Sequence, residues 1–250
     1  MRNGFHIFDT HTHIGEAWHN GRSMSADDLL RKMDEHGIDR SLVFPFPVVE
    51  EYRRQHDLIG LAVKQHPDRL TGAACLDPRL PGRQFQEEIR RCREVYGFRA
   101  IKLQPQYQGL DPMSDSSSFF FETAVENRLP VIWHTGAGVP FALPSLCMAP
   151  ARQFPELTLV VAHCGGGVFV QEAVLAALFC PNIVLELSSL MPNQVLEVLA
   201  KVPSDRLMIG SDLPENTDTE IGKILALPVP DADKRLILSG TACRVFGQEP

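Results

Sequence analysis

The chain has 250 residues, a formal net charge of −7 and six cysteines. This length suits one large α/β domain, and an acidic balance without a basic stripe argues against a nucleic-acid partner. The cysteines form no Cys-x-x-Cys pair, which favours a reducing compartment over a disulfide framework. The first apolar stretch begins too early to leave room for a signal peptide, and no apolar segment is long enough to span a bilayer. We therefore expect a soluble, cytoplasmic protein that does not bind membranes.

Strand-like and helix-like segments alternate along the chain. Short apolar runs predict eight strands, at residues 7–11, 41–46, 70–76, 100–104, 130–134, 157–163, 183–187 and 207–211. The segments between and after them predict helices at 26–36, 50–65, 83–96, 117–127, 169–179, 193–202 and 219–226, one interrupted helix within 140–155, and further helix from 232 with a short final helix at 240–247. The helix at 26–36 has the clearest limits, because Ser25 is a good N-cap and Gly37 a good C-terminal stop.

This alternation predicts one (β/α)₈ TIM-type barrel domain over residues 1–250. Short apolar strands separated by helices indicate a parallel sheet, and eight such units in about 250 residues is the usual size of a closed barrel. An open doubly wound sheet is the alternative, but no Gly-x-Gly-x-x-Gly motif follows the first strand. In a closed barrel the eighth strand lies beside the first, so residues distant in sequence come together at its mouth.

Histidine and aspartate side chains follow the apolar runs. His11 and His13 come at the end of the first strand, His134 ends the fifth, His163 ends the sixth and Asp212 follows the eighth. Taken singly, each histidine is more often a hydrogen-bonded structural residue, but barrel enzymes build their sites at the carboxyl ends of strands. Imidazole nitrogens and carboxylate oxygens bind divalent metals. The set predicts one divalent ion, with zinc as the first choice, and a spare histidine beside it; a second ion is left open.

These residues together resemble the amidohydrolase superfamily, specifically the amidohydrolase-related (amidohydrolase 2) branch that includes aminocarboxymuconate semialdehyde decarboxylase. The resemblance runs from Asp9-Thr-His-Thr-His13 to the terminal segment 240–247, and it implies a distorted barrel with a metal-dependent activity. It also implies roles for single residues, namely His11, His13, His134 and Asp212 as metal ligands, His163 as the group that handles the proton of the metal-bound water, and Asp212 as the base.

Three features depart from the pattern of that branch. Thr241 stands where relatives often carry Asn, which resembles a harmless exchange of helix caps. Glu186 stands on the seventh strand, where many relatives have a smaller acidic residue. The chain is also shorter than many relatives, so we expect part of their lid or dimerisation insert to be missing, and a homodimer is left open.

Lys102, in the fourth strand, has three alternative roles. In binuclear members of the superfamily a strand-four lysine is carbamylated and bridges two metals. An inward lysine also suits a substrate carboxylate, or pairs with Asp212 or Glu186, because an unpaired buried charge is costly.

The loops at the same end of the barrel supply candidate substrate contacts. They carry, together with the inward Lys102, the side chains of Trp18, Arg22, Phe46 and Tyr107. These suit a small, partly aromatic or carboxylated molecule, although ordinary loop packing explains each of them as well.

Three functions fit this reading of the sequence. The first is a metal-dependent hydrolase that activates water to attack a C–N, lactone or ester-type bond of a small molecule. The alternative is a non-oxidative decarboxylase of a small carboxylic acid, because the branch contains both. A metal-binding barrel without catalysis is third, since an open coordination position would then have no purpose.

Overall fold

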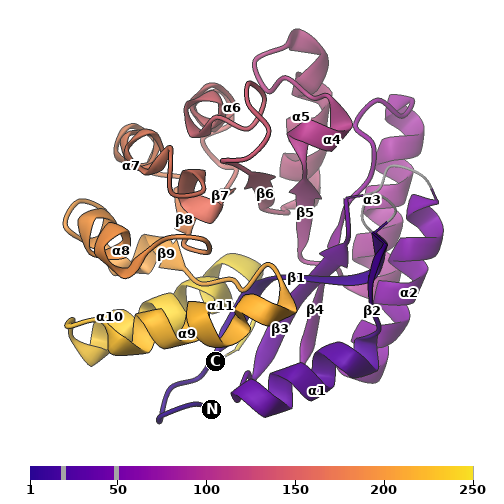
Figure 1. Ribbon diagram of the computed structural model, residues 1–250. Coiled ribbons are helices and arrows are strands. Elements are labelled where there is room, and N and C mark those ends of the chain that lie inside the picture. Colours follow the sequence, from indigo (N-terminus) through magenta and orange to yellow (C-terminus); the bar gives the residue numbers. More distant parts are fainter. Residues whose placement is uncertain (18–20, 48–50, 250) are drawn as a thin grey trace.

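The computed structural model describes residues 1–17, 21–47 and 51–249. Within these residues one curled sheet of nine strands forms the centre, with helices packed around its outside (Figure 1). The strand order is β2-β1-β3-β4-β5-β6-β7-β8-β9, and all neighbours are parallel except β2, which is antiparallel to β1. The strands are β1 (Phe8–Ala17), β2 (Arg22–Met24), β3 (Arg40–Pro45), β4 (Leu70–Ala74), β5 (Ala100–Leu103), β6 (Val131–His134), β7 (Leu159–Ala162), β8 (Ile183–Glu186) and β9 (Leu207–Met208).

The seam between β9 and β1 closes through single hydrogen bonds. Thr10 N donates to Ile209 O over 3.1 Å, and the Thr10 hydroxyl reaches the same carbonyl at 2.6 Å. Asp212 N then donates to His11 O at 2.8 Å. These bonds join the two ends of the parallel sheet into a ring, so the prediction of a (β/α)₈ barrel is confirmed.

The helices lie around the barrel in chain order (Figure 1). They are α1 (Ala26–His36), α2 (Tyr52–Gln65), α3 (Gly82–Tyr96), α4 (Pro105–Gln108), α5 (Ser118–Asn127), α6 (Met148–Gln153), α7 (Val170–Phe179), α8 (Pro192–Leu199), α9 (Thr217–Ala226), α10 (Asp231–Arg235) and α11 (Thr241–Phe246). A π-helical turn, Leu236–Gly240, joins the last two. Among the described residues, no helix combines the length and apolar character needed to cross a membrane.

Helix α1 has the predicted limits because its caps are encoded locally. The Ser25 hydroxyl accepts a hydrogen bond from Asp28 N at 3.0 Å, and the Asp28 carboxylate accepts one from Ser25 N, which completes a capping box. Gly37 ends the helix with φ of 69°, a left-handed conformation that glycine adopts at little cost.

Apolar side chains fill the barrel and leave only its carboxyl end for chemistry. Phe8, Phe44 and Met208 belong to this buried interior cluster, and Phe246 of α11 packs against Phe8 with ring centroids 5.9 Å apart. Helix α11 therefore closes the amino ends of the strands. The six cysteines are all buried as free thiols, as the absence of a disulfide motif predicts.

Several element limits differ from the predictions. The hairpin strand β2 was not predicted, because Arg22–Met24 are largely exposed and show no apolar alternation. The short helix α4 was missed as well. The segment 207–211 is a strand only over Leu207–Met208, since the chain then bends toward Asp212, whose φ is 63°. Residue 50, at the predicted start of the helix at 50–65, lies outside the described residues.

A candidate metal centre at the barrel mouth

Two histidines from β1 and one aspartate after β9 meet at the carboxyl end of the barrel. His11 and His13 are two residues apart in one strand, so their side chains lie on the same face. His11 Nε2 and His13 Nε2 each lie 3.5 Å from Asp212 Oδ1. The three donor atoms all fall within 4.8 Å of one another. Closure of the barrel thus brings together residues that are about 200 positions apart in sequence.

The contacts of His13 leave its Nε2 directed at Asp212. His13 Nδ1 lies 3.0 Å from Pro45 O, and because a carbonyl oxygen only accepts, Nδ1 carries a proton. In a metal-bound form, Nε2 presents a lone pair to the ion, and the Asp212 carboxylate faces the same point. A divalent ion between two such acceptors satisfies both.

The backbone around this cluster is strained. Asp212 has φ of 63°, His163 62° and Cys164 42°, all in the left-handed region that costs side-chain-bearing residues energy. Such strain concentrates where side chains must be aimed for function. At Asp212 it turns the carboxylate back over β1.

His163 and His134 lie next to the cluster of His11, His13 and Asp212, but their donor atoms are not part of that group. The His163 ring centroid is 4.5 Å from that of His11 and 4.8 Å from that of His134. His134 Nε2 donates to Ala137 O at 3.0 Å, and no group of mutually close donor atoms among the described residues includes His134. The role of His134 as fourth ligand therefore stays a prediction.

Burial favours the neutral form of His11, His134 and His163. Burial, with a smaller effect from Lys102, lowers the pKa of His134 to about 4. Burial also holds the pKa values of His11 and His163 well below the usual value of a histidine. Neutral imidazoles are the form that binds metals.

Glu186 lies behind His11 and His163 at the end of β8. Its Oε2 accepts hydrogen bonds from His163 N and the Ser188 hydroxyl, both at 2.9 Å, and its Oε1 accepts one from Ser188 N at 2.6 Å. Ser188 Oγ is in turn 2.6 Å from His163 Nδ1. From the sequence, Glu186 stood out only as a departure from relatives and as a candidate partner of Lys102. Ser188 was not predicted, although Glu-x-Ser at a strand end was an available signal.

Lys102 points into the barrel against His11. It is fully buried, its Nζ lies 3.1 Å from His11 Nε2, and it sits over the Phe44 ring at 5.0 Å. Burial lowers the pKa of Lys102 to about 8. Among the described residues no direct ion pair joins its Nζ to Asp212 or Glu186, although both carboxylates act against burial and raise its pKa.

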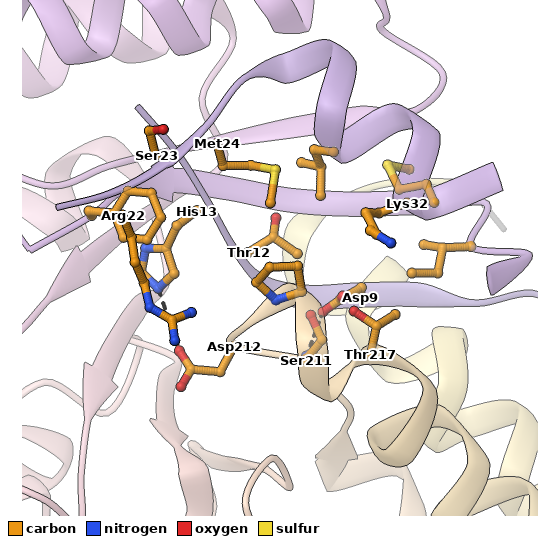
Figure 2. A pocket seen from close by; sticks show the side chains of 15 residues that line it. Asp9, Thr12, His13, Arg22, Ser23, Met24, Lys32, Ser211, Asp212 and Thr217 are labelled. Carbon is orange, nitrogen blue, oxygen red and sulfur yellow. Dashed lines mark hydrogen bonds and ion pairs between the residues drawn. The ribbon is translucent and has the colours of Figure 1, made fainter. Parts of the chain in front are cut away.

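A pocket opens beside the cluster, between the β1–β2 hairpin, α1 and the segment after β9 (Figure 2). Its volume is about 640 Å³, counting space open to solvent, and His13 and Asp212 form one of its walls. The Phe46 ring stacks on His13 with centroids 4.9 Å apart and an interplanar angle of 14°. Arg22 extends toward Asp212 in Figure 2 and pairs with Glu215 at 2.6 Å.

The predicted substrate contacts divide accordingly. Arg22 and Phe46 line this pocket, whereas Tyr107 and Lys102 do not. Tyr107 is 43% exposed in the short helix α4, because that helix turns its tyrosine outward. Trp18 lies outside the described residues.

Comparisons with known proteins agree with this architecture. A family model described as amidohydrolase matches residues 8–248. A 5-carboxyvanillate decarboxylase from Novosphingobium aromaticivorans, solved with manganese and 4-hydroxy-3-methoxy-5-nitrobenzoic acid, has a TM-score of 0.80 and 15% identity over 98% of this chain and 96% of that chain. A 2,6-dihydroxybenzoate decarboxylase from Rhizobium has a TM-score of 0.76 and 16% identity over 97% and 99% of the two chains.

A third solved structure is of a different enzyme class. The 4-oxalomesaconate hydratase from Rhodopseudomonas palustris has a TM-score of 0.75 and 20% identity, over 96% of this chain and 95% of that chain. No curated protein sequence matches the chain. At these identities the structural likenesses establish the shared fold.

Proposed function

The chain belongs to the amidohydrolase family, and from that premise we propose that it is a metal-dependent, non-oxidative decarboxylase of a small aromatic carboxylic acid. From the sequence alone, hydrolysis was the first candidate and decarboxylation the second. The similar structures support the second reading better, because two of the three are of aromatic-acid decarboxylases. The proposal therefore reverses the order of the two candidates.

One observation carries the proposal, namely that a single pocket joins the ligand cluster to an aromatic surface and a cation. Phe46 stacks on His13 and provides a flat wall for a substrate ring. Arg22, on the same pocket, offers a planar guanidinium beside Asp212 (Figure 2), and guanidinium groups suit carboxylates. An aromatic acid matches both features, whereas a neutral lactone uses only one.

The residues of the cluster fit a divalent ion. Ligands bound tetrahedrally at about 2.0–2.2 Å lie roughly 3.4 Å apart, and the two nitrogen–oxygen distances here are 3.5 Å. His11, His13 and Asp212 would hold the ion, which supplies a Lewis acid for the anionic oxygens of the substrate. Zinc is the ion that the sequence favours, and manganese, present in one similar structure, suits the same donors.

The reaction breaks the bond between ring and carboxylate, releases CO₂ and adds one proton to the vacated ring carbon. Asp212 is 29% exposed and faces the pocket, whereas the His11 side chain is 1% exposed. In the proposed reaction Asp212 takes up a proton from the substrate or from solvent and delivers it to the ring carbon.

The test is a substrate panel in D₂O. Protein stripped with a chelator and reloaded with zinc or manganese is given hydroxylated benzoates, and matched lactones and anilides that lack a carboxylate. We expect CO₂ release and one deuterium at the vacated ring carbon, seen by proton NMR, only with reloaded protein. Turnover of lactones or anilides without CO₂ release would return hydrolysis to first place.

A further inference from the structure

We propose that Glu186 and Ser188 are positioning residues that decide which ring nitrogen of His163 carries the proton. The inference concerns the site of the proposed function and rests on it only for its catalytic consequence. In this arrangement Nδ1 of His163 is protonated, and Nε2 presents its lone pair to the barrel mouth.

The contacts of Glu186 determine which atom donates in the hydrogen bonds between Glu186, Ser188 and His163. Its carboxylate only accepts, and it faces Ser188 Oγ at 2.9 Å. The single hydroxyl proton of Ser188 therefore points at Glu186. Toward His163, at 2.6 Å, the same oxygen has only lone pairs left, so Nδ1 must be the donor.

Burial makes this proton the only one on the ring. His163 is 4% exposed, and an uncompensated charge is costly at such a position. A neutral imidazole with its proton on Nδ1 has an unprotonated Nε2. That nitrogen is thereby available to accept a proton or to bind a metal ion.

His11 also lies near this carboxylate, although without a hydrogen bond to it. Its Nδ1 is buried without a hydrogen-bond partner and lies 3.4 Å from Glu186 Oε2. Its Nε2 lies 3.1 Å from Lys102 Nζ, which can only donate when protonated. The buried Glu186 carboxylate thus lies near Nδ1 of both histidines, and an acceptor at that place favours a proton on Nδ1 in each of them.

The backbone of the segment after β9 leaves room for this carboxylate. A Cβ at Gly210 would lie 2.8 Å from Glu186 Oε1 and 2.5 Å from the Cβ of His11. Both distances are too short for real atoms. A side chain at position 210 would therefore collide first with His11 and then with the Glu186 carboxylate, which lies against this backbone.

The experiment reads the tautomer directly. Full-length protein with ¹⁵N-labelled histidine is studied by long-range ¹H–¹⁵N NMR in zinc-loaded and metal-free forms, and His163→Gln identifies the signals of His163. We expect a protonated Nδ1 in the wild type in both forms. Ser188→Ala should lose that signal and gain a protonated Nε2, whereas Ser188→Thr, which keeps a hydroxyl, should retain the wild-type pattern.

Ser189→Ala is the matched control, since it makes the same change at the next residue, which is exposed, and it should leave the spectrum unchanged. In Ser188→Ala we expect kcat to fall roughly 10–100-fold with KM unchanged, the usual effect of removing a partner of this kind.

A wild-type spectrum with a protonated Nε2 on His163 overturns the proposal, and so does a Ser188→Ala spectrum identical to the wild type. The wild-type spectrum decides even if a variant does not fold. The tautomer is measured without substrate, so it can be tested apart from the proposed function. A protein with a protonated Nδ1 on His163 that decarboxylates no substrate would refute the proposed function but not the positioning role of Glu186 and Ser188.

Discussion

At the scale of one residue, the backbone conformation of Asp212 determines where its carboxylate lies. Its left-handed backbone, with φ of 63°, turns the carboxylate over β1. The N–H of Asp212 donates a hydrogen bond to His11 O at 2.8 Å. Two imidazoles then face one carboxylate oxygen. Asp212 thus contributes both to the closure between β9 and β1 and to the candidate metal site.

Asp212→Asn should keep the shape of this site but remove its charge and basicity. We expect weaker metal binding and, at saturating metal, a fall in turnover of about 10²–10⁴, the usual value of a lost proton-transfer group. The melting temperature should change little, because residues at the carboxyl face contribute little to the barrel core. Asp205→Asn, at the opposite end of the barrel, is the control. Near-normal turnover of Asp212→Asn would exclude the proton-transfer role.

Lys102→Met tests whether Lys102 is an unmodified amine or a carbamylated bridge between two ions. Lys102 Nζ lies 3.1 Å from His11 Nε2, so amine and metal compete for one lone pair. Removing the amine should tighten zinc binding by about tenfold, the equivalent of one net hydrogen bond. Elemental analysis of dialysed protein measures this. If a carbamylated Lys102 instead bridges two ions, the same substitution will lose metal, and the intact mass of the wild type will show the modification.

At the scale of elements, a buried ionic network joins α2 and α3 to the end of β4. Glu88 is fully buried and accepts hydrogen bonds from His56 at 2.8 Å and from Arg91 at 2.7 Å. The other His56 ring nitrogen accepts one from Cys75 N at 3.0 Å. Because both nitrogens have partners and an arginine neutralises the carboxylate, this cluster is a structural network rather than a metal site.

Glu88→Gln should destabilise the protein by about 3–5 kcal/mol at pH 7, the cost of breaking a buried ion pair. Burial alone would raise the pKa of Glu88, but the hydrogen bonds from His56 and Arg91 lower it to about 2. The native state thus favours the ionised form, so the stabilisation is complete above the ordinary value of 4.5 and is lost as the pH falls toward 2.

Urea unfolding of wild type and variant at pH 7 and at pH 3 measures this dependence. The difference in unfolding free energy should shrink at the lower pH. Glu87→Gln, at the neighbouring exposed position, is the control, because its pair with Arg83 is on the surface and such pairs contribute little. An equal effect of both substitutions would contradict the network.

At the scale of the whole molecule, the proposed ion spans the weakest seam of the barrel. β9 and β1 share no ladder, and the seam depends on single bonds such as those of Thr10 to Ile209 O and of Ser211 N to Asp9 at 2.8 Å. The ligands come from both sides of it. Metal binding and global stability should therefore be coupled.

Removal of metal should lower the melting temperature. An ion at 100 times its dissociation constant stabilises the folded state by about 2.7 kcal/mol, which for a chain of this size is roughly 5–10 °C. Thermal unfolding with chelator and with added zinc or manganese measures the shift. His13→Ala, which lacks a ligand, should show the same low melting temperature with and without metal. A wild type that responds to neither chelator nor metal would mean that no ion binds at the seam.

Local signals in the sequence were sufficient for most of the elements, although not for β2 and α4, and for the cluster of His11, His13 and Asp212. The caps Ser25 and Gly37 delimit α1 because they satisfy backbone groups only a few residues away. The positions of His11, His13 and Asp212 at strand ends predicted their meeting once eight strands implied closure. These inferences succeed because period, caps and strand ends are properties of neighbouring residues.

The tertiary structure alone decided which atoms face each other. It set Glu186 and Ser188 behind His163, turned His134 Nε2 onto Ala137 O, placed Lys102 on His11 rather than on a carboxylate, and left Tyr107 out of the pocket. Contacts of this kind depend on side-chain packing between strands and loops that are far apart in sequence. No local pattern encodes them, because each side chain settles against atoms that only barrel closure brings within reach.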